Sequence, residues 1–303
     1  MRFAIFGNEY QPEKSAMMQR VLDFLVRSKV EIFVDRPFYE FLLRQAASEN
    51  ASETTVQQLK RLGVFDDDNF QTDYAVSMGG DGTFLKAASR VGTKGIPIIG
   101  VNMGRLGFLA DVLPGEIEEA FETLMRGEAA IEEHAVIECM VEEQDGQLRQ
   151  ASAFPYALND IAVLKRDTAS MITIRTSVDG EFLVTYQADG LIVSTPTGST
   201  AYNLSNGGPI MVPKSGILCL TPVAPHSLNI RPIVIHDDCE IELEVESRSH
   251  NFLVAIDGRS EKVEQGTRLM IRRAPHTVKV VKRPAQRYFS TLRGKMMWGA
   301  DKR

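Results

Sequence analysis

Asp81 has the surroundings of a residue that takes part in chemistry, because glycines flank it in the motif GGDGT, residues 79–83. The apolar run YAVSM precedes this motif, and the helical pattern FLKAASRV follows it. Glycines let a backbone approach a ligand closely, and the N–H groups at a helix N-terminus attract phosphate. A carboxylate at such a turn could cap the helix, bind a metal ion or accept a proton from a hydroxyl group. The motif alone leaves the capping role and the catalytic role open.

Two further motifs lie in strand patterns. NMGRLGFL, residues 102–109, follows the apolar run PIIGV, and ligands of open α/β sheets bind at the carboxyl ends of such strands. Taken alone, this motif favours a plain left-handed turn. The adjacent polar residues Asn159 and Asp160 interrupt the strand pattern ALNDIAVL. They could form hydrogen bonds to a ribose, although a β-bulge is the simpler interpretation.

The longest polar stretch is DGLIVSTPTGSTAYNLSNGGPI, residues 189–210. Five of the seven residues from Ser194 to Thr200 carry a hydroxyl group. Hydroxyl groups on a flexible backbone can bind many polar atoms of a nucleotide, and Tyr202 could pack beside a base. A loop stabilised by its own side-chain turns is the alternative. The length of the run between two apolar segments favours ligand binding.

Several other kinds of chemistry lack a sequence signal. The chain contains no Walker A loop, no GxGxxG motif, no HExxH motif and no GxSxG elbow. Its five histidines and three cysteines are widely spaced, which disfavours a zinc site or a disulfide framework and indicates a reducing compartment. These residues are His134, His226, His236, His250, His276, Cys139, Cys219 and Cys239.

The composition is that of a folded globular protein, with 303 residues, 44% hydrophobic residues and a net charge of −6. A net acidic chain is a poor candidate for non-specific binding to nucleic acid. The N-terminal run MRFAIFG is too short for the core of a signal peptide, and no apolar stretch approaches the length of a membrane span. We therefore expect a cytoplasmic protein with no nucleic-acid partner and no membrane partner.

Charge is unevenly distributed along the chain. Residues 268–303 hold 11 basic residues and one acidic residue, net +10, whereas the other 267 residues hold 23 basic and 39 acidic residues, net −16. Residues 111–145 alone contain 12 acidic residues and one basic residue. Such runs are typical of complementary surfaces that meet within a chain or between subunits. A basic segment that faces a phosphate-rich ligand is the alternative.

Patterns of strands and helices predict two kinds of domain. Strands alternate with helices in the first half, which favours a parallel sheet covered by helices. From Glu138 onward, short strand candidates follow one another, and Asp-Gly pairs at 145–146, 179–180 and 257–258 indicate hairpins. We predict an α/β N-terminal domain with a parallel sheet, plus a strand-rich antiparallel β C-terminal domain. The expected boundaries are 1–137 for the α/β domain, 138–275 for the β-rich domain and 276–303 for a basic segment that packs back on the first domain.

Together, these motifs resemble the NAD kinase family. GGDGT, NMGRLGFL, the Asn159–Asp160 pair and the 189–210 stretch occur in the order seen in that family, and PVAPHSL at 222–228 resembles a further family element. The resemblance covers about residues 74–292. The GGDG element is shared in outline with diacylglycerol and sphingosine kinases and, more remotely, with phosphofructokinases. The long 189–210 stretch is specific to the NAD kinases.

The resemblance implies transfer of the γ-phosphoryl group of ATP to the 2′-hydroxyl of the adenosine ribose of NAD, which gives ADP and NADP. Asp81 matches the proposed proton acceptor, Gly80 and Gly82 would keep the backbone close to phosphates, and Lys86 could meet a phosphate. The positions that match the NAD-binding residues of the β-rich domain are Asn159, Asp160, Asp189, Thr200, Ala201, Tyr202, Asn203, Leu204 and Ser205.

Three positions depart from the family pattern or vary within it. Many relatives have Glu where this chain has Asp160, and Gln is common where it has Arg259. Gln187 occupies a position at which relatives vary, so the roles of Gln187 and Arg259 stay open. The resemblance also implies a divalent cation, Mg²⁺, held mainly by ATP, and assembly as a homodimer or homotetramer.

Two other functions remain as alternatives. A lipid kinase of the diacylglycerol kinase type would need an apolar acceptor pocket and a membrane-binding surface, and the sequence shows no amphipathic basic helix. A non-catalytic NAD-binding regulator would be expected to lack the carboxylate of the GGDG element, whereas Asp81 is present.

Overall fold

The computed structural model describes residues 1–9, 15–48, 52–104, 107–142, 146–167, 170–282 and 288–299. The chain forms two compact units: Met1–Glu133 with Val278–Arg303, and His134–Thr277. The boundaries expected from the sequence were 137/138 and 275/276. Two strands, β6 (Ala130–Glu142) and β18 (Arg268–Lys282), each contain residues of both units.

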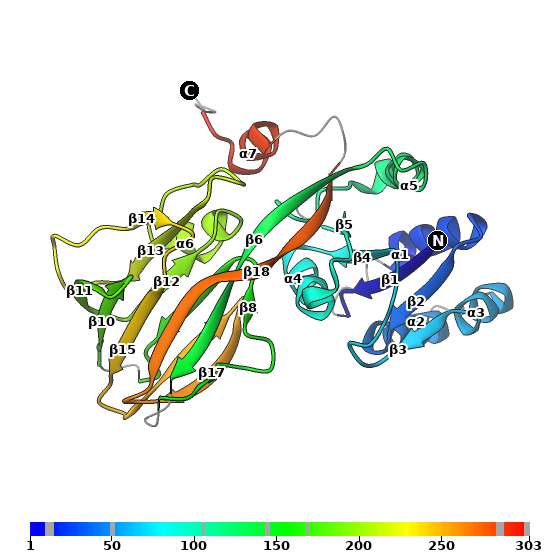
Figure 1. Cartoon of the computed structure of the whole chain (residues 1–303). Helices are drawn as coiled ribbons and strands as arrows, with labels where there is room; N and C mark the ends of the chain where they lie inside the picture. Colours follow the sequence, from blue (N-terminus) through cyan, green and yellow to red (C-terminus); the bar gives the residue numbers. More distant parts are fainter. Residues whose placement is uncertain are drawn as a thin grey trace. The chain divides into compact units, whose positions relative to one another are not determined.

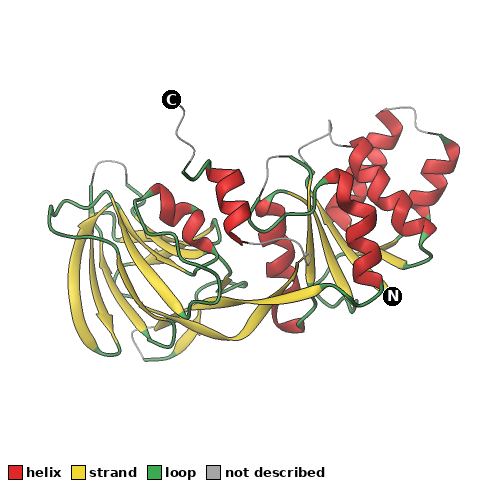
Figure 2. Ribbon diagram, turned by 90° about the horizontal axis from the view of Figure 1, so that it is seen from above, coloured by secondary structure: helices red, strands yellow, loops and turns green. Residues whose placement is uncertain are grey.

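The first unit contains a parallel sheet with the strand order β5-β4-β1-β2-β3, and helices flank its strands (Figures 1 and 2). The end of β18 lies parallel to β5, where Val280 pairs with Ile98. The strands are β1 (Arg2–Gly7), β2 (Glu31–Asp35), β3 (Gly63–Phe65), β4 (Tyr74–Gly79) and β5 (Ile98–Asn102). The helices are α1 (Ser15–Arg27), α2 (Arg36–Ser48), α3 (Glu53–Lys60), α4 (Asp81–Val91), α5 (Ile117–Met125) and α7 (Tyr288–Met296), with the short 3₁₀ turns η2 (Gly92–Lys94) and η3 (Pro114–Glu116).

Helical periodicity explains how this unit builds its core. In α1, the apolar side chains of Met18, Val21, Leu22 and Leu25 recur every three or four residues and are buried. They pack in one cluster with residues of α2, α5 and the strands, whose side chains are buried along β1 and β4. A parallel sheet buried in this way needs continuous apolar strands, and the sequences of these strands provide them.

The second unit is a sandwich of two antiparallel sheets. One sheet has the order β11-β10-β15-β18, with β6 beside β18 and two short strands on β6. The other has the order β14-β13-β12-β9-β16-β17. A single cluster of buried side chains draws on strands of both sheets. Elements introduced here are β7 (Leu148–Gln150), β8 (Tyr156–Ala157), β9 (Asp160–Leu164), β10 (Ile172–Val178), β11 (Glu181–Ala188), β12 (Gly190–Ser194), β13 (Ile217–Val223), β14 (Ile233–His236), β15 (Ile241–Glu246), β16 (Asn251–Ile256) and β17 (Arg259–Glu264), together with η4 (Gly198–Thr200) and α6 (Tyr202–Ser205).

The fold class expected from the sequence is confirmed, and so are two of the hairpin turns. Asp179–Gly180 joins β10 to β11, and Asp257–Gly258 joins β16 to β17, each with positive φ at both residues. Positive φ at both positions is the conformation for which Asp-Gly is selected in two-residue hairpins. Of the third pair, Asp145 lies outside the described residues.

Some elements differ from the sequence-based expectation. The apolar sequence patterns at 268–273 and 277–283 predict two separate strands, but β18 continues through Pro275. Proline fits a strand where its missing N–H is not needed, and Pro275 is exposed. The strand β17 and the helices α6 and α7 were not predicted at all. Pro12, which the sequence pattern predicts to be the start of the first helix, lies outside the described residues, as do Arg105 and Leu106.

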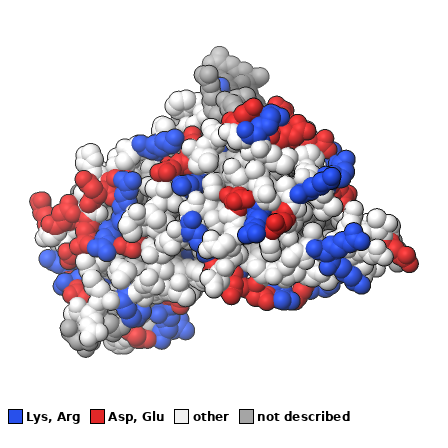
Figure 3. Space-filling model, turned by 45° about the vertical axis from the view of Figure 1, so that its right-hand side comes forward, with Lys and Arg blue, Asp and Glu red and all other residues white. Residues whose placement is uncertain are grey.

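Within the described part of the chain, no helix is long and apolar enough to span a membrane. On the face shown in Figure 3, basic and acidic side chains lie next to one another. Three basic residues of β18 are likewise paired with acidic residues: Arg268, Arg272 and Arg273 form ion pairs with Glu142, Glu138 and Asp237, respectively.

Candidate active site

Asp81 lies at the start of α4, where the end of β4 meets the end of β5. Gly79 pairs with Asn102 in the parallel ladder, so the loops that follow these two strands are adjacent. The helix is capped at Gly80 without a side-chain hydrogen bond, so the capping role left open by the sequence is not the role of Asp81. Its carboxylate instead reaches across to the loop after β5.

Three backbone N–H groups hold this carboxylate. Oδ2 accepts a hydrogen bond from Phe108 N at 3.0 Å, and Oδ1 accepts hydrogen bonds from Leu109 N and Ala110 N, each at 3.1 Å. Lys295 Nζ donates to Oδ2 at 3.3 Å. Hydrogen bonds to an ionised carboxylate fix its orientation more firmly than bonds to a neutral group. Asp81 therefore presents a carboxylate in a fixed position that is still partly exposed, at 30% of its side-chain area.

Asn102 fixes the loop that supplies these donors. Its Oδ1 accepts a hydrogen bond from Gly104 N at 2.7 Å, and its Nδ2 donates to the carbonyl of Ala110 at 3.3 Å. Gly104, which precedes the residues outside the described part of this motif, does not have positive φ. The motif builds a clamp for Asp81.

The glycines around Asp81 have different packing. A Cβ atom on Gly107 would collide with Asp81 Oδ1, and one on Gly79 would collide with the side chain of Thr83. A Cβ atom on Gly80 or Gly82 would meet no protein atom within 4 Å. Packing therefore requires glycine at positions 79 and 107. The backbone at positions 80 and 82 instead faces open space at the N-terminus of a helix, where an anion can bind.

Lys86, the basic residue expected to meet a phosphate, lies in a charge cluster one turn further along α4. Its Nζ contacts Asp35 Oδ2 at 2.9 Å and Glu9 Oε1 at 3.1 Å. Asp35 is fully buried and also pairs with Arg90. Burial alone would lower the pKa of the Lys86 ammonium, but the two carboxylates outweigh it and raise the pKa. In this structure the charge of Lys86 is balanced by protein carboxylates.

A second group of predicted residues gathers at one edge of the β unit. Strand β9 begins at Asp160, which pairs with Ser194 at the end of β12, and its next residue pairs with Ile256 at the end of β16. This register brings Asn159, the segment from Thr195 to Gly198, and Asp257 to the same edge. Asn159, just before β9, therefore lies among polar groups from three segments of the chain.

Asp257 is the residue that holds this edge together. Its carboxylate accepts hydrogen bonds from the N–H groups of Leu158 (2.8 Å), Asn159 (2.8 Å) and Asp160 (3.2 Å). Thr195 closes the other side, because its N–H donates to the carbonyl of Asn159 at 2.9 Å. The sequence marked Asp257 only as a turn residue, and no local signal pointed to partners nearly 100 residues away.

The side chains of Asn159 and Asp160 at this edge are both buried, and each has an unusual property, a missing hydrogen bond for Asn159 and a raised pKa for Asp160. Asn159 is 9% exposed, and its Oδ1 accepts no hydrogen bond from the described residues. Asp160 is 7% exposed. Burial, together with the nearby charge of Asp257, raises the pKa of Asp160 to about 7. A buried polar atom without a partner is costly, so Asn159 Oδ1 is available to a ligand.

The hydroxyl-rich stretch forms η4 and α6 instead of an open loop. Asn203 is fully buried: its Nδ2 donates to the carbonyls of Ser199 and Pro209, and its Oδ1 accepts a hydrogen bond from Thr221 at 2.6 Å. Gly198 is required by packing, because a Cβ atom there would collide with the carbonyl of Asn159. The stretch is thus fixed against the Asn159 edge by its own side chains.

The remaining predicted residues lie on or beside this stretch. Tyr202 is 39% exposed at the start of α6. Asp189, just before β12, forms an ion pair with Lys165 at 2.7 Å. Arg259 Nη2 donates to the carbonyl of Tyr156 at 3.1 Å, and burial lowers the pKa of its guanidinium. The other members of the predicted set are Thr200, Ala201, Leu204 and Ser205, of which Ser205 is exposed and the others are half-buried.

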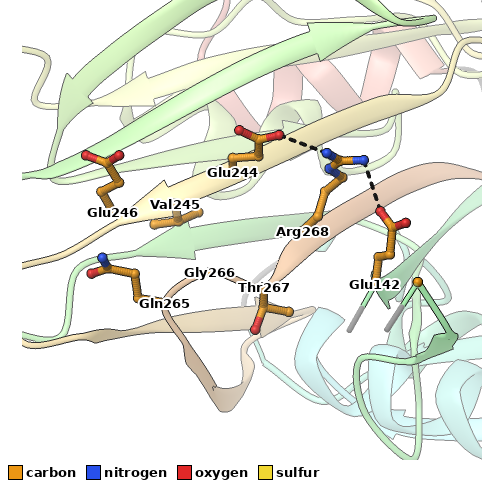
Figure 4. A pocket seen from close by; sticks show the side chains of 9 residues that line it. Glu142, Glu244, Val245, Glu246, Gln265, Gly266, Thr267 and Arg268 are labelled. Atoms are coloured by element: carbon orange, nitrogen blue, oxygen red, sulfur yellow. Dashed lines mark hydrogen bonds and ion pairs between the residues drawn. The ribbon is translucent and has the colours of Figure 1, made fainter. Parts of the chain in front are cut away.

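Two cavities in the β unit lie apart from these groups. One, of about 430 Å³, is lined by Glu142, Glu244 and Glu246 around Arg268, which bridges Glu142 and Glu244 (Figure 4). The other, of about 600 Å³, includes Gln187 and His226 among its lining residues. Gln187 accepts a hydrogen bond from the backbone N–H of His226 at 2.8 Å. Neither cavity contains Asp81 or the Asn159–Asp160 pair.

The first unit is a parallel α/β unit whose clamped carboxylate lies at a helix start that attracts phosphate. The second unit is a β sandwich with a buried polar edge. These features are those of a nucleotide-dependent kinase. Two family models match the chain: the ATP-NAD kinase N-terminal domain over residues 3–129 and the ATP-NAD kinase C-terminal domain over residues 158–283. The chain therefore belongs to the NAD kinase family, and it is an enzyme that phosphorylates NAD with ATP.

Similar proteins and structures agree with this assignment. The chain is 55% identical to the NAD kinase of Bacteroides fragilis over 303 residues, which is the whole of both chains. It is 41% identical to the NAD kinase of Porphyromonas gingivalis over 299 residues, 99% of this chain and 98% of that protein. An NAD kinase from Archaeoglobus fulgidus in complex with ATP has a TM-score of 0.73 at 26% identity and covers 98% of this chain and 99% of its own. Yeast NADH kinase complexed with NADH shares the fold, with a TM-score of 0.87 at 22% identity over 100% of this chain and 89% of that chain.

Proposed function

We propose that this chain transfers the γ-phosphoryl group of ATP to the 2′-hydroxyl of the adenosine ribose of NAD, with Asp81 as the proton acceptor. The clamped position of the Asp81 carboxylate carries the proposal. Three backbone donors hold the carboxylate, and its partial exposure leaves room for a hydroxyl group. A ribose hydroxyl is a very weak acid, so a fixed carboxylate helps as the new bond forms.

In this account, ATP binds beside Gly80 and Gly82. The open space at both glycines lets a phosphate approach the backbone, and the N-terminus of α4 favours its negative charge. ATP brings Mg²⁺ as part of the substrate, and the ion shields the triphosphate. The archaeal relative was crystallised with ATP, which supports the choice of phosphoryl donor. Lys86 would contribute a phosphate contact through the third N–H of its ammonium group while it keeps both carboxylate partners.

NAD binds to the polar edge of the β unit in the same account. Asn159 Oδ1 and the Asp160 carboxylate supply acceptors for ribose hydroxyl groups, and Tyr202 offers an exposed ring to a base. Asn203 acts through the segment that it holds, since its polar atoms already bond to protein groups. The other proposed contacts are Asp189, Thr200, Ala201, Leu204 and Ser205.

We further propose that the chain assembles as a homodimer or homotetramer, as its family resemblance implies, and that it acts in the cytoplasm, as its widely spaced cysteines indicate. The direct test of the reaction is to incubate the purified chain with Mg-ATP and NAD and to measure NADP with an NADP-specific dehydrogenase. We expect NADP to accumulate with time and enzyme concentration, and only when ATP is present. A folded preparation that binds ATP and NAD but forms no NADP would contradict the proposal.

A further inference from the structure

Lys295 and Asp81 form an ion pair between residues that are 214 positions apart in the sequence. Lys295 lies near the end of α7, and its Nζ is 3.3 Å from Asp81 Oδ2. Both residues belong to the first compact unit. Among the described residues, Lys295 is the basic side chain in contact with this carboxylate. The C-terminal helix therefore brings a positive charge to the residue that we propose as proton acceptor.

Phe108 connects α7 to the carboxylate. The ammonium group of Lys295 lies 4.2 Å from the centroid of the Phe108 ring, a cation–π contact, and the backbone N–H of Phe108 donates to the same oxygen, Oδ2. The ring of Tyr288 lies 6.3 Å from the ring of Phe108, and Leu292 is buried. Apolar contacts thus hold the helix, and Lys295 is not needed as its only anchor.

The exposure of this ion pair argues against a purely structural role. The side chains of Lys295 and Asp81 are 27% and 30% exposed, and ion pairs in contact with water add little to stability. Lys282 and Asp111, in the same unit, form an ion pair that is largely shielded from water, because their side chains are 15% and 1% exposed and lie 2.7 Å apart. Because Lys295 stays accessible to solvent beside the proposed base, it can exchange the Asp81 carboxylate for a ligand group.

We propose that Lys295 is a catalytic residue that leaves Asp81 and binds the γ-phosphoryl group during its transfer. The proposal rests on the proposed function. If Asp81 accepts the proton of the 2′-hydroxyl, the ribose oxygen lies about 3 Å from the carboxylate, and the phosphorus lies about 3–3.5 Å beyond that oxygen. The flexible four-carbon stem of lysine can cover this distance by rotation of its side-chain torsions.

The 2′-oxygen of NAD forms a bond to the γ-phosphorus of ATP, and the bond from that phosphorus to the β–γ bridging oxygen breaks. The electron pair of the broken bond stays on ADP, and the proton of the 2′-hydroxyl moves to the carboxylate of Asp81. Lys295 keeps its proton throughout and donates hydrogen bonds to the non-bridging oxygens, where the negative charge of the phosphoryl group is spread.

Three variants test this role. Lys295→Met removes the charge and keeps an apolar stem on Phe108, and Lys295→Arg keeps the charge. Arg293→Met is the matched control, because Arg293 is an exposed basic residue of the same helix. For each variant we would measure kcat, the KM values for ATP and NAD, the melting temperature and the binding of NAD by calorimetry.

We expect Lys295→Met to lower kcat about 100-fold, as the loss of a donor to the reacting group does in other enzymes, with small changes in both KM values and in NAD binding. Lys295→Arg should recover much of this loss, and Arg293→Met should behave as wild type. A kcat of Lys295→Met within about threefold of wild type would overturn the proposal. So would a loss of activity that Lys295→Arg does not relieve and that follows a fall in melting temperature and NAD binding.

Asp81→Asn, assayed alongside, separates this proposal from the proposed function. If Asp81→Asn keeps its turnover while Lys295→Met loses it, the proton-acceptor role fails and a role of Lys295 at the phosphoryl group stands. If Asp81→Asn loses turnover while Lys295→Met keeps it, only the proposal for Lys295 fails.

Discussion

Gly107 and Asp81 approach each other so closely that any side chain on Gly107 would collide with Asp81 Oδ1. The three residues that follow Gly107 donate the backbone hydrogen bonds that hold the Asp81 carboxylate. The position of the proposed base thus depends on the absence of a Cβ atom in a loop 26 residues further along the chain. In the sequence, the same glycine looks like an ordinary turn residue.

Gly107→Ala should therefore damage both stability and turnover. The added methyl group forces the loop away from Asp81, at a cost of about 1–3 kcal/mol for overpacking. We expect a lower melting temperature and at least a tenfold loss of kcat. Gly115→Ala is the control, because a Cβ atom at Gly115 meets no atom within 4 Å. A Gly107→Ala protein with wild-type kcat would show that the clamp is not needed.

Gly82→Ala should affect ATP without affecting the fold. A Cβ atom at Gly82 meets no protein atom within 4 Å, and alanine in a helix is more stable than glycine by about 0.5–1 kcal/mol. If phosphate approaches the backbone here, the methyl group blocks it, so the KM for ATP should rise while the melting temperature stays the same or increases. An unchanged KM for ATP would place the nucleotide elsewhere.

The state of Asp160 predicts a pH-dependent effect on stability. The pKa of Asp160 in the folded chain is about 7, above its ordinary value of 3.8. Between these pH values the folded chain holds a proton that the unfolded chain has released, so this group lowers stability as the pH rises from about 4 to 7. Asp160→Asn removes the charge and should raise the free energy of unfolding at pH 8 by an amount on the order of 1–4 kcal/mol, and by much less at pH 5, so its melting temperature should exceed that of the wild type mainly at pH 8.

Thermal denaturation of both proteins at pH 5 and pH 8 checks this prediction. The same difference in melting temperature at the two pH values would mean that Asp160 titrates normally. The KM for NAD provides a second readout. If the ionised carboxylate accepts hydrogen bonds from a ribose, the KM of the wild-type enzyme should rise as the pH falls from 8 to 6, and that of Asp160→Asn should stay nearly constant.

Tyr202→Ala should weaken NAD binding with little change in the fold. Tyr202 is 39% exposed, so the loss of its ring removes little buried surface from the folded protein. Removal of a ring that stacks on a base costs about 1–3 kcal/mol, which corresponds to a rise in the KM for NAD of roughly 5- to 150-fold. An unchanged KM for NAD, together with an unchanged melting temperature, would count against a role of Tyr202 in binding.

Local sequence patterns predicted the parts of the fold that depend on neighbouring residues. Apolar runs marked the parallel strands β4 and β5, and Asp-Gly pairs marked two hairpins, because strand burial and turn geometry are set by a few adjacent residues. The polar run at 189–210 did not reveal η4 and α6. Its hydroxyl groups bond within the run and to the carbonyls of Met211 and Leu158, and these contacts form only after folding.

The contacts that orient the candidate site depend on tertiary structure. Asp257 reaches residues 97 to 99 positions away, and Lys295 reaches Asp81 across 214 positions, so no spacing rule connects them. The motif containing Gly107 was recognised, but the collision that requires glycine there appears only when the loop after β5 faces α4. Lys86 shows the reverse case. The family resemblance suggested that Lys86 could meet a phosphate, whereas the structure pairs it with the carboxylates of Asp35 and Glu9.

Asp81→Asn tests the central claim most directly, through kcat at saturating ATP and NAD. Asparagine can accept the hydrogen bonds of Leu109 and Ala110 through its oxygen, but its NH₂ group would face Phe108 N–H and Lys295, so we expect a moderately lower melting temperature. Assays well below that temperature, on protein shown to bind NAD, isolate the chemical step. We predict a kcat at least about 100-fold below wild type, with a smaller change in the KM for NAD. A folded Asp81→Asn enzyme with kcat within about threefold of wild type would contradict the assignment of Asp81 as the proton acceptor.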